Sequence, residues 1–441
     1  MSHEGGGQAV RHLLLPLAVF ACIHTLLFLF DLQDPEAFTR GDRADLRMEL
    51  VQGVLAAPAG QRSETVIQYG VPGDYLFHAL LLGTVGQYGT IALQIIAGAL
   101  CLLLVFRLAQ ILGAGPRTAS LAALLYTLMP GSFMNPHLLV TESFYTLFFT
   151  AGAYFAVRMF RQGDARAFWL AAVAWSLAAA LRPQAMIFMP GLALAATLLY
   201  PRRLPIAAPA ALLSLLIFPG LWLAWRYGQV GHFGMGETSF DLGVNMRMRA
   251  DRVFHMLGEK AYLAGAEEMR IGLGEFLRNL ASYPTLFLRT YVSDVINFLL
   301  NPGANAVAGY YLALFSVAED VHAWKLLMDS EGLLAVIKAI LASGHRMALA
   351  FGLFGLVHLV ALLGILPGLW YAVVKPPRQA GAVLFGILLV GSAVVFAAGL
   401  VRWTHRAPLE PLIAVFAVYG LGMLVSAWRA RRDPLPSSDT P

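Results

Sequence analysis

Long apolar segments, separated by short polar connections, constrain the fold of this chain more than any other feature. The first, at about residues 13–30, has the length of roughly 17–25 residues that a helix needs to cross the hydrocarbon core of a bilayer. Hydrophobic residues make up 58% of the sequence and charged residues only 13%, whereas soluble domains carry about 25% charged residues. The sequence therefore predicts an all-α polytopic membrane protein.

The apolar pattern predicts about ten transmembrane helices. The first segment is longer than the apolar part of a signal peptide and lacks its small-residue cleavage site, so we expect it to be retained. An alternative with twelve spans, in which residues 75–86 and 284–300 also cross, stays open. The ten predicted spans are residues 13–30, 91–112, 118–134, 143–160, 166–182, 184–200, 205–225, 347–374, 380–401 and 408–428.

Basic residues gather in the short connections on one side of these spans. An excess of Lys and Arg in short loops marks the cytoplasmic side of a membrane protein. Both termini are then cytoplasmic, which an even number of spans requires, and the predicted location is the cytoplasmic (inner) membrane. The residues concerned are Arg11, Arg107, Arg117, Arg158, Arg161, Arg166, Arg202, Arg203, Lys375, Arg378, Arg429, Arg431 and Arg432.

Residues 1–432 are predicted to form a single membrane domain, followed by a disordered tail at 433–441 that is rich in Pro and Ser. Two longer segments, 31–90 and 226–346, fall on the external side. Amphipathic stretches inside them are expected to lie along the membrane surface. These stretches are residues 75–86, 274–280 and 284–300.

The net charge of +5 suggests at first a nucleic-acid partner. The basic residues, however, lie in short loops between apolar spans, which is the distribution of a membrane protein. We therefore predict membrane lipids as partners and no nucleic acid.

Acidic residues follow the first span directly. Asp42 comes after a glycine and before an apolar stripe at Leu46, Leu50 and Val54, which has helical spacing. Asp42 either caps this helix, with Asp45 pointing to water, or acts as a general base that takes a proton from an incoming hydroxyl. The acidic residues are Asp31, Asp34, Glu36, Asp42, Asp45, Glu49, Glu64 and Asp74.

Two charged residues mark the outer ends of the middle spans. Glu142, in the motif HLLVTESFYTLFF, either belongs to a capping box at a helix N-terminus or supplies a second acidic group to an external cavity shared with Asp42. Arg182, in AALRPQAM, opposes the positive-inside trend. It either extends to lipid headgroups or binds an anion.

The last external connection, LVRWTHRAPLEPL, holds Arg402, His405 and Arg406. Because guanidinium groups bind phosphate oxygens bidentately, these cations suit a phosphate ligand; His405 also fits an ordinary interface residue. His78 and Tyr75, in the first external segment, are further candidates for substrate contact. Tyrosines there also fit the aromatic belt of membrane proteins.

Together these signals predict an outward-facing cavity with a carboxylate base and a basic rim. A donor linked to a lipid phosphate fits this arrangement, since its tail lies in the bilayer and its phosphate at the rim. Phosphate leaves readily, so one carboxylate on the opposite face of the sugar suffices for an inverting transfer. The sequence has no GxxxxGK[ST] loop, no HExxH and no DxD pair, so no cofactor is predicted. A divalent metal stays an open alternative that no motif indicates.

The chain resembles the GT-C superfamily of membrane glycosyltransferases, especially bacterial relatives of the protein O-mannosyltransferases and the aminoarabinose transferases. The resemblance covers about residues 13–430 and rests on the order of its motifs. These are GDRADLRMELVQG (41–53), VPGDYLFHALLLGTVGQYG (71–89), FRLAQILGAGPRTASLAALLYTLMPG (106–131), TESFYTLFFTAGAYFAVR (141–158), LAAALRPQAMIFMPGL (177–192) and RWTHRAPLEPL (402–412).

The resemblance implies a GT-C-like fold and transfer of a sugar from a polyprenyl-phosphate-linked donor to an extracytoplasmic acceptor, which would be a glycolipid, a lipid-linked glycan or a protein. It places the catalytic base on Asp42, with Asp34 and Asp45 as rivals. Here Arg43 follows Asp42 and Leu46 stands where the family often has an aromatic residue. The resemblance also implies that Arg402 and Arg406 contact the donor phosphate.

Other functions remain open at this stage. An O-antigen polymerase or ligase would share the compartment and the lipid carrier but take an oligosaccharide. A lipid or sugar transporter would place charged residues at mid-membrane and show a two-fold repeat; the acidic residues gather instead near the outer ends of the spans. A non-catalytic assembly subunit is the last alternative.

Overall fold

The computed structural model describes residues 4–39, 44–56, 72–230, 242–258, 271–301, 327–342, 345–375, 378–397 and 406–432. Throughout these ranges the regular secondary structure is helical, which confirms the predicted all-α class. The first part of the chain forms α1 (Glu4–Gln33), η1 (Pro35–Thr39), α2 (Ala44–Ala56), α4 (Pro72–Ile111), α5 (Pro116–Thr127), α6 (Pro130–Met134), η2 (Asn135–His137), α7 (Glu142–Gln162), α8 (Arg166–Leu181), η3 (Pro183–Ile187) and α9 (Phe188–Leu199). The second part forms η4 (Pro201–Arg203), α10 (Leu204–Leu215), η5 (Leu216–Gly220), α11 (Leu221–Val230), α12 (Leu242–Met256), α14 (Leu273–Ser282), α15 (Pro284–Leu300), α18 (Leu333–Ala342), α19 (His345–Val374), α20 (Arg378–Ala397), η6 (Ala407–Leu409) and α22 (Glu410–Arg432).

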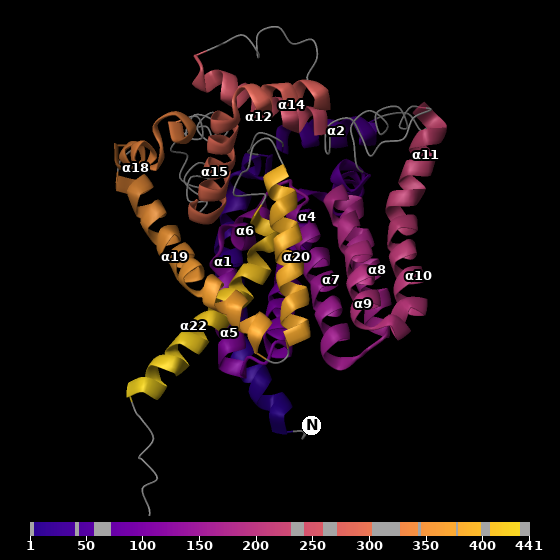
Figure 1. The fold of residues 1–441 in the computed structure, drawn as a ribbon, viewed down its shortest axis with the longest axis vertical. Helices are drawn as coiled ribbons and strands as arrows, with labels where there is room; N and C mark the ends of the chain where they lie inside the picture. Colours follow the sequence, from indigo (N-terminus) through magenta and orange to yellow (C-terminus); the bar gives the residue numbers. More distant parts are fainter. Residues whose placement is uncertain are drawn as a thin grey trace, which may run out of the picture.

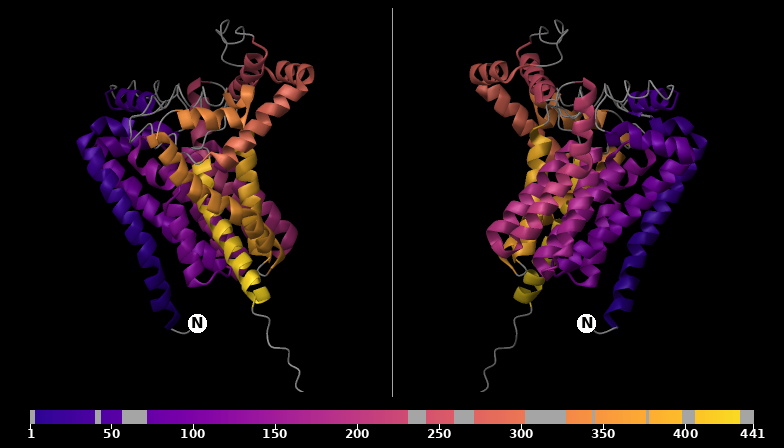
Figure 2. Two further views of the ribbon diagram at one scale, coloured as in Figure 1. Left: turned by 90° about the vertical axis from the view of Figure 1, so that its left-hand side faces the viewer. Right: turned by 90° about the vertical axis from the view of Figure 1, so that its right-hand side faces the viewer.

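The long helices run between two ends of the molecule (Figure 1). The upper end holds α2, α12, α14 and α18, and the lower end holds the start of α1, the α7–α8 connection and the end of α22. Figure 2 shows the same division from two other sides. The described parts of the two predicted external segments therefore gather at one end, and the described basic connections gather at the other.

Six of the described helical segments are long and apolar enough to cross a membrane, so the chain is a multi-pass membrane protein. They are Arg11–Gln33, Leu76–Ile111, Leu204–Trp225, Gly352–Val374, Gln379–Phe396 and Ala407–Arg429. Shorter apolar helices occupy Arg166–Leu181, Pro183–Leu199 and Leu333–Ala342. The total of ten spans and the cytoplasmic position of the termini stay predictions, and the tail at 433–441 lies outside the described residues.

Helix α4, from Pro72 to Ile111, consists of two helical parts that meet at a kink. The prediction separated an interfacial segment at 75–86 from a span at 91–112, and the kink at Gly86 lies between the two. Gly86 has φ of 69° and ψ of −176°, a conformation that glycine adopts readily because it has no Cβ atom. The interfacial position of residues 75–86 stays a prediction.

The predicted span at 118–134 is broken. Helix α5 ends at Thr127, and the short helix α6 begins at Pro130. Met129 is extended, with ψ of 142°, because a proline ring disfavours the helical conformation in the residue before it. Residues 129–141, called here the buried connection, then lead through α6 and η2 to α7, and all of residues 129–139 are buried.

Small residues let the core helices approach one another closely, as is common between helices in membranes. The buried Trp175 of α8 lies against Gly152 of α7 and donates a hydrogen bond to the carbonyl of Phe149, 3.3 Å away. In α19, a side chain at Gly364 or Gly368 would overlap the backbone of α22. Helices α19 and α22 therefore cross in direct backbone contact.

The second external segment contains two of the predicted amphipathic stretches. Residues 274–280 lie in α14 and residues 284–300 form α15, and both pack with α12 around Phe287. The opposite face of α15 exposes apolar side chains whose spacing places them along one side of the helix. These are Leu288, Val292, Val295 and Leu299, which are 63%, 48%, 40% and 39% exposed. This apolar face agrees with the predicted position at the membrane surface.

Candidate functional site

The buried connection lies at the upper end and is held by polar contacts from two helices. Gln94 of α4 donates from Nε2 to the carbonyl oxygens of Pro136 and Leu138, each 3.1 Å away. The backbone N–H of Leu139 donates to the carbonyl of Phe38, at 2.8 Å. Buried backbone groups need such partners, and the second contact joins the start of the first external segment to the buried connection.

A chain of three buried polar side chains lies behind this connection. Oδ2 of Asp31, near the end of α1, is 2.5 Å from Nδ1 of His137. Nε2 of His137 is 2.9 Å from Nδ1 of His24, and the two imidazole rings stack. All three side chains are 2% exposed or less. Residues more than 100 positions apart thus form one hydrogen-bonded unit where the first external segment begins.

The chemistry of this unit follows from its donors and acceptors. An ionised Asp31 only accepts, so His137 donates from Nδ1 and accepts at Nε2 from the Nδ1–H of His24. The carboxylate then fixes the tautomer and orientation of His137, as acidic residues do for histidines in many functional sites. Asp31 and His137 can therefore hold one another rigidly, and the unit can pass a proton along its length.

Substitution of His137 is expected to show how much this hydrogen-bonded unit contributes to the stability of the protein. His137→Phe leaves the buried Asp31 carboxylate without its hydrogen bond, which should cost about 1–3 kcal/mol of stability or more. The measurement is the thermal unfolding midpoint in detergent. The variant His255→Phe serves as the control because His255 is exposed; equal midpoints for the two variants would contradict the expected role.

The structure brings two of the predicted site residues together. Arg182, at the end of α8, forms an ion pair through Nη2 with Oε1 of Glu142, at the start of α7, and its Nε lies 3.4 Å from Oγ1 of Thr141. The guanidinium also stacks over the ring of Tyr145, 5.6 Å from its centroid. Helix α7 has no side-chain hydrogen bond at its N-cap. Thr141 and Glu142 therefore interact with Arg182 and do not form a capping box.

Arg406 is buried directly before η6, where it binds the end of another helix. Its Nη1 donates to the carbonyl of Phe298, in the last turn of α15, at 2.6 Å. His358 of α19 donates to the next carbonyl, that of Leu299. Cations interact favourably with the free carbonyls at a helix C-terminus. Arg406 thus attaches the second external segment to the membrane helices.

Glu410 connects Arg406 to the buried connection. Its Oε1 lies 3.9 Å from Nε of Arg406 and its Oε2 accepts from the backbone N–H of Gly131 at 3.0 Å. Gly131 has no room for a side chain, because a Cβ atom would overlap Ala407 and Glu410. The start of α22 therefore packs directly on α6, beside the rest of the site.

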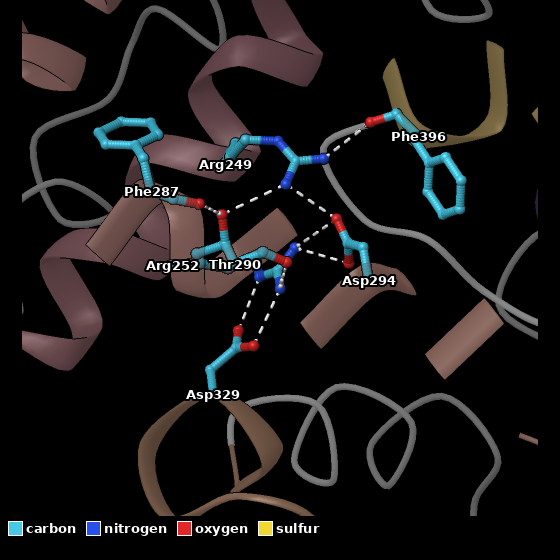
Figure 3. A network of polar contacts seen from close by, with 7 residues as sticks. All are labelled: Arg249, Arg252, Phe287, Thr290, Asp294, Asp329 and Phe396. Carbon is cyan, nitrogen blue, oxygen red and sulfur yellow. Dashed lines mark hydrogen bonds and ion pairs between the residues drawn. The ribbon is translucent and has the colours of Figure 1, made fainter. Parts of the chain in front are cut away.

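A second polar network anchors the external segment, and Figure 3 shows its side chains. Arg252 of α12 pairs with Asp294 of α15 at 3.0 Å and with Asp329 at 2.7 Å. Arg249 pairs with the same Asp294 at 2.8 Å and donates to the carbonyl of Phe396, at the end of α20, at 3.0 Å. The four charged side chains are 2% exposed or less.

Burial and pairing act on these arginines in opposite directions. Burial lowers the pKa of Arg249, against the raising effect of the Asp294 charge. Burial acts in the same direction on Arg252, but its hydrogen bonds to Asp329 and the charges of Asp294 and Asp329 raise its pKa above the ordinary value. Both arginines stay charged, because a guanidinium keeps its proton at any physiological pH.

The remaining predicted site residues are described only in part. His78 is fully buried in α4, one residue after Phe77, whose ring packs on Phe144. Asp45 and Tyr75 lie in α2 and α4, but their side chains lie outside the description. The residues outside the described ranges altogether are Asp42, Arg402 and His405.

Sequence reasoning missed His24, His137 and the role of Asp31. One signal was available, because a histidine inside an apolar span needs a polar partner when it is buried. The partner itself could not be identified, since 113 and 106 positions separate His137 from His24 and Asp31. Within the described ranges, no group of three or more His, Cys, Asp or Glu side chains is arranged to hold a metal ion.

A family model covers one part of this site. Residues 65–224 match the model of dolichyl-phosphate-mannose-protein mannosyltransferases. The predicted resemblance to relatives of the protein O-mannosyltransferases is confirmed over this range. The matched range includes the buried connection, Glu142 and Arg182, but not Asp31, His24 or Arg406. A search of the curated proteins found no match to this sequence.

The chain is also similar to several solved structures. An oligosaccharyltransferase from Archaeoglobus fulgidus in the apo form has a TM-score of 0.49, 14% identity and coverage of 96% of this chain and 52% of that one. The AglB oligosaccharyltransferase of the same organism, in complex with an inhibitory peptide and a dolichol-phosphate, has a TM-score of 0.42 and 12% identity, with coverage of 97% of this chain and 52% of that one. ArnT from Cupriavidus metallidurans, bound to undecaprenyl phosphate, has a TM-score of 0.38 and 14% identity, with coverage of 97% of this chain and 80% of that one. The chain thus spans about half the length of both archaeal proteins.

Proposed function

We propose that this protein is a glycosyltransferase that moves a sugar from a polyprenyl-phosphate-linked donor to an acceptor outside the cytoplasmic membrane. The observation that carries the proposal is the match of residues 65–224 to a family whose sugar is attached to a lipid phosphate. The structure supports it by pairing Glu142 with Arg182 at the upper ends of α7 and α8, opposite the basic connection that joins these helices at the lower end. By the positive-inside rule, this upper end faces away from the cytoplasm.

The proposed reaction is a single displacement at the anomeric carbon. A carboxylate takes the proton from an acceptor hydroxyl, the hydroxyl oxygen attacks the sugar carbon, and the bond to the phosphate oxygen breaks. The electron pair of that bond stays with the phosphate, which leaves as polyprenyl phosphate. Attack from the face opposite the phosphate inverts the configuration of the sugar.

The roles follow from where the residues lie in the chain. Asp42 is the proposed base, with Asp34 and Asp45 as rivals, because the first external segment begins directly at the buried site around Phe38. Glu142 is the proposed supporting acid, since its pair with Arg182 fixes both side chains at the upper end.

Arg182 is the described cation best placed for the donor phosphate. Its side chain is 21% exposed, and the contacts described for it, with Thr141 and Glu142, involve only Nε and Nη2. Since a guanidinium has five N–H donors, the Nη1 edge can serve a phosphate. Arg406 is buried and donates from Nη1 to the carbonyl of Phe298; its phosphate contact stays a prediction. The other predicted substrate contacts are Arg402, His405, His78 and Tyr75.

The test of the proposed base compares Asp42→Asn, Asp34→Asn and Asp45→Asn in reconstituted protein. The variant that removes the base should transfer sugar about 10²–10⁴-fold more slowly, which is the usual contribution of a general base. Asp164→Asn is the matched control, because Asp164 pairs with Arg158 in the α7–α8 connection at the lower end. If the three test variants all kept the wild-type rate, none of Asp42, Asp34 and Asp45 would be the base.

An O-antigen polymerase or ligase is the second candidate, because it would use the same lipid phosphate chemistry. The two functions differ in the glycan on the carrier. Transfer from monosaccharide-linked polyprenyl phosphate supports the proposed function, and transfer only from a lipid-linked oligosaccharide supports the second.

A further inference from the structure

A cavity at the lower end lies far from the candidate site. Its volume is about 480 Å³, and it is lined by Arg11, His12, Gly115, Pro116 and Arg117. Specific small-molecule sites have volumes of about 300–1,000 Å³, so the cavity has room for a headgroup-sized ligand. We call it the basic pocket.

The two helices that form the basic pocket are fixed to each other. Helix α1 packs along α5, and the Ser120 hydroxyl of α5 donates to the carbonyl of His12 at 2.6 Å. Arg11 begins an apolar segment long enough to cross a membrane, so the pocket lies where the charged end of this segment meets its apolar part. The two arginines are therefore presented on a rigid edge at the depth of lipid headgroups.

The surface beside the basic pocket is apolar. Leu14 and Leu15 of α1 and Leu121 of α5 are 58%, 61% and 55% exposed. In a chain that spans the membrane, such leucines face lipid tails. A ligand with a phosphate in the pocket and hydrocarbon chains along these leucines would satisfy both surfaces.

The charge of the lower end favours an anion. Beside the pocket arginines, the described helix ends and connections there carry Arg107, Arg161, Arg166, Arg202 and Lys375. The acidic Asp164 at this end pairs with Arg158 at 3.0 Å. Basic pockets between membrane helices on the cytoplasmic side attract anionic lipid headgroups.

We propose that the basic pocket binds the phosphate of an anionic phospholipid, with Arg11 and Arg117 as its ligands. Phosphate is the shared chemistry of a lipid headgroup and of the free ion, and the exposed leucines favour the lipid. This inference is independent of the proposed transferase activity, because it concerns the opposite end of the molecule.

The experiment measures the thermal unfolding midpoint of the full chain in phosphatidylcholine micelles, with increasing phosphatidylglycerol. A ligand that binds only the folded state raises this midpoint. The test variant is Arg11→Gln/Arg117→Gln, and the control is Arg161→Gln/Arg202→Gln, which removes the same charge at the same end outside the pocket. The midpoint in pure phosphatidylcholine shows whether each variant is folded.

We expect phosphatidylglycerol to raise the unfolding midpoint of the wild type and of the control variant. In the pocket variant most of this rise should be lost. Equal losses in both variants would overturn the proposal, since unspecific attraction would then account for the effect. An unchanged effect in the pocket variant would overturn it as well. Should inorganic phosphate reproduce the full rise at equal concentration, the ligand would be the free ion and the lipid assignment would be wrong.

Discussion

Replacing Arg252 by methionine is expected to destabilise the protein by about 3–5 kcal/mol, the usual cost of leaving a buried charge without its partner. Arg252 holds Asp329 through two hydrogen bonds, at 2.7 and 3.0 Å, and also pairs with Asp294 at 3.0 Å. In the variant, Asp294 still pairs with Arg249. Asp329, in contrast, loses both of its hydrogen bonds to Arg252. We expect a lower unfolding midpoint and faster proteolysis of the second external segment.

The matched control for Arg252 is Arg158→Met. Arg158 also pairs with an aspartate at 3.0 Å, but the two side chains are 37% and 25% exposed, and exposed pairs contribute only about 0–1 kcal/mol. A second comparison removes both partners, in Arg252→Met/Asp329→Leu, and should recover much of the loss because no unpaired charge remains. Similar midpoints for Arg252→Met and Arg158→Met would contradict the expectation.

The second large effect is expected at the crossing of α19 and α22. In Gly368→Ala the new Cβ atom would overlap the carbonyl oxygen of Phe416. A backbone atom inside a helix cannot rotate away, so the helices must separate, and overpacking of this kind costs about 1–3 kcal/mol. The measurement is the unfolding midpoint together with the yield of folded protein.

Gly355→Ala is the control for this crossing, because Gly355 lies in the same helix and a Cβ atom there would meet nothing within 4 Å. Alanine has the higher helix propensity, by about 1 kcal/mol in water. The control is therefore expected to be neutral or slightly stabilising. If both alanine variants had the same midpoint, the close crossing would be absent in the protein.

The sequence predicted the helical class and the position of most long helices, because apolar length determines which segments can cross a bilayer. It also separated residues 75–86 from the span at 91–112, and the structure kinks α4 at Gly86, between the two. The break before Pro130 was not predicted, because the apolar stretch at 118–134 looked like one span.

Part of the candidate site was also predictable from the residue types. Charged residues at the outer ends of spans drew attention to Glu142 and Arg182, and the structure pairs them. Their pairing could not be predicted, since they are 40 positions apart. Arg406 shows why the partners of a cation are hard to predict, because its guanidinium donates to the carbonyl of Phe298, which is 108 positions away.

The most direct test of the central claim is release of free polyprenyl phosphate by reconstituted wild-type protein. The substrate is a polyprenyl-phosphate monosaccharide labelled in its lipid, and a crude membrane extract supplies the acceptor. The proposed function predicts release of the labelled lipid phosphate together with transfer of the sugar to an acceptor. Movement of the intact donor across the bilayer without release would contradict the proposed function and identify a transporter instead.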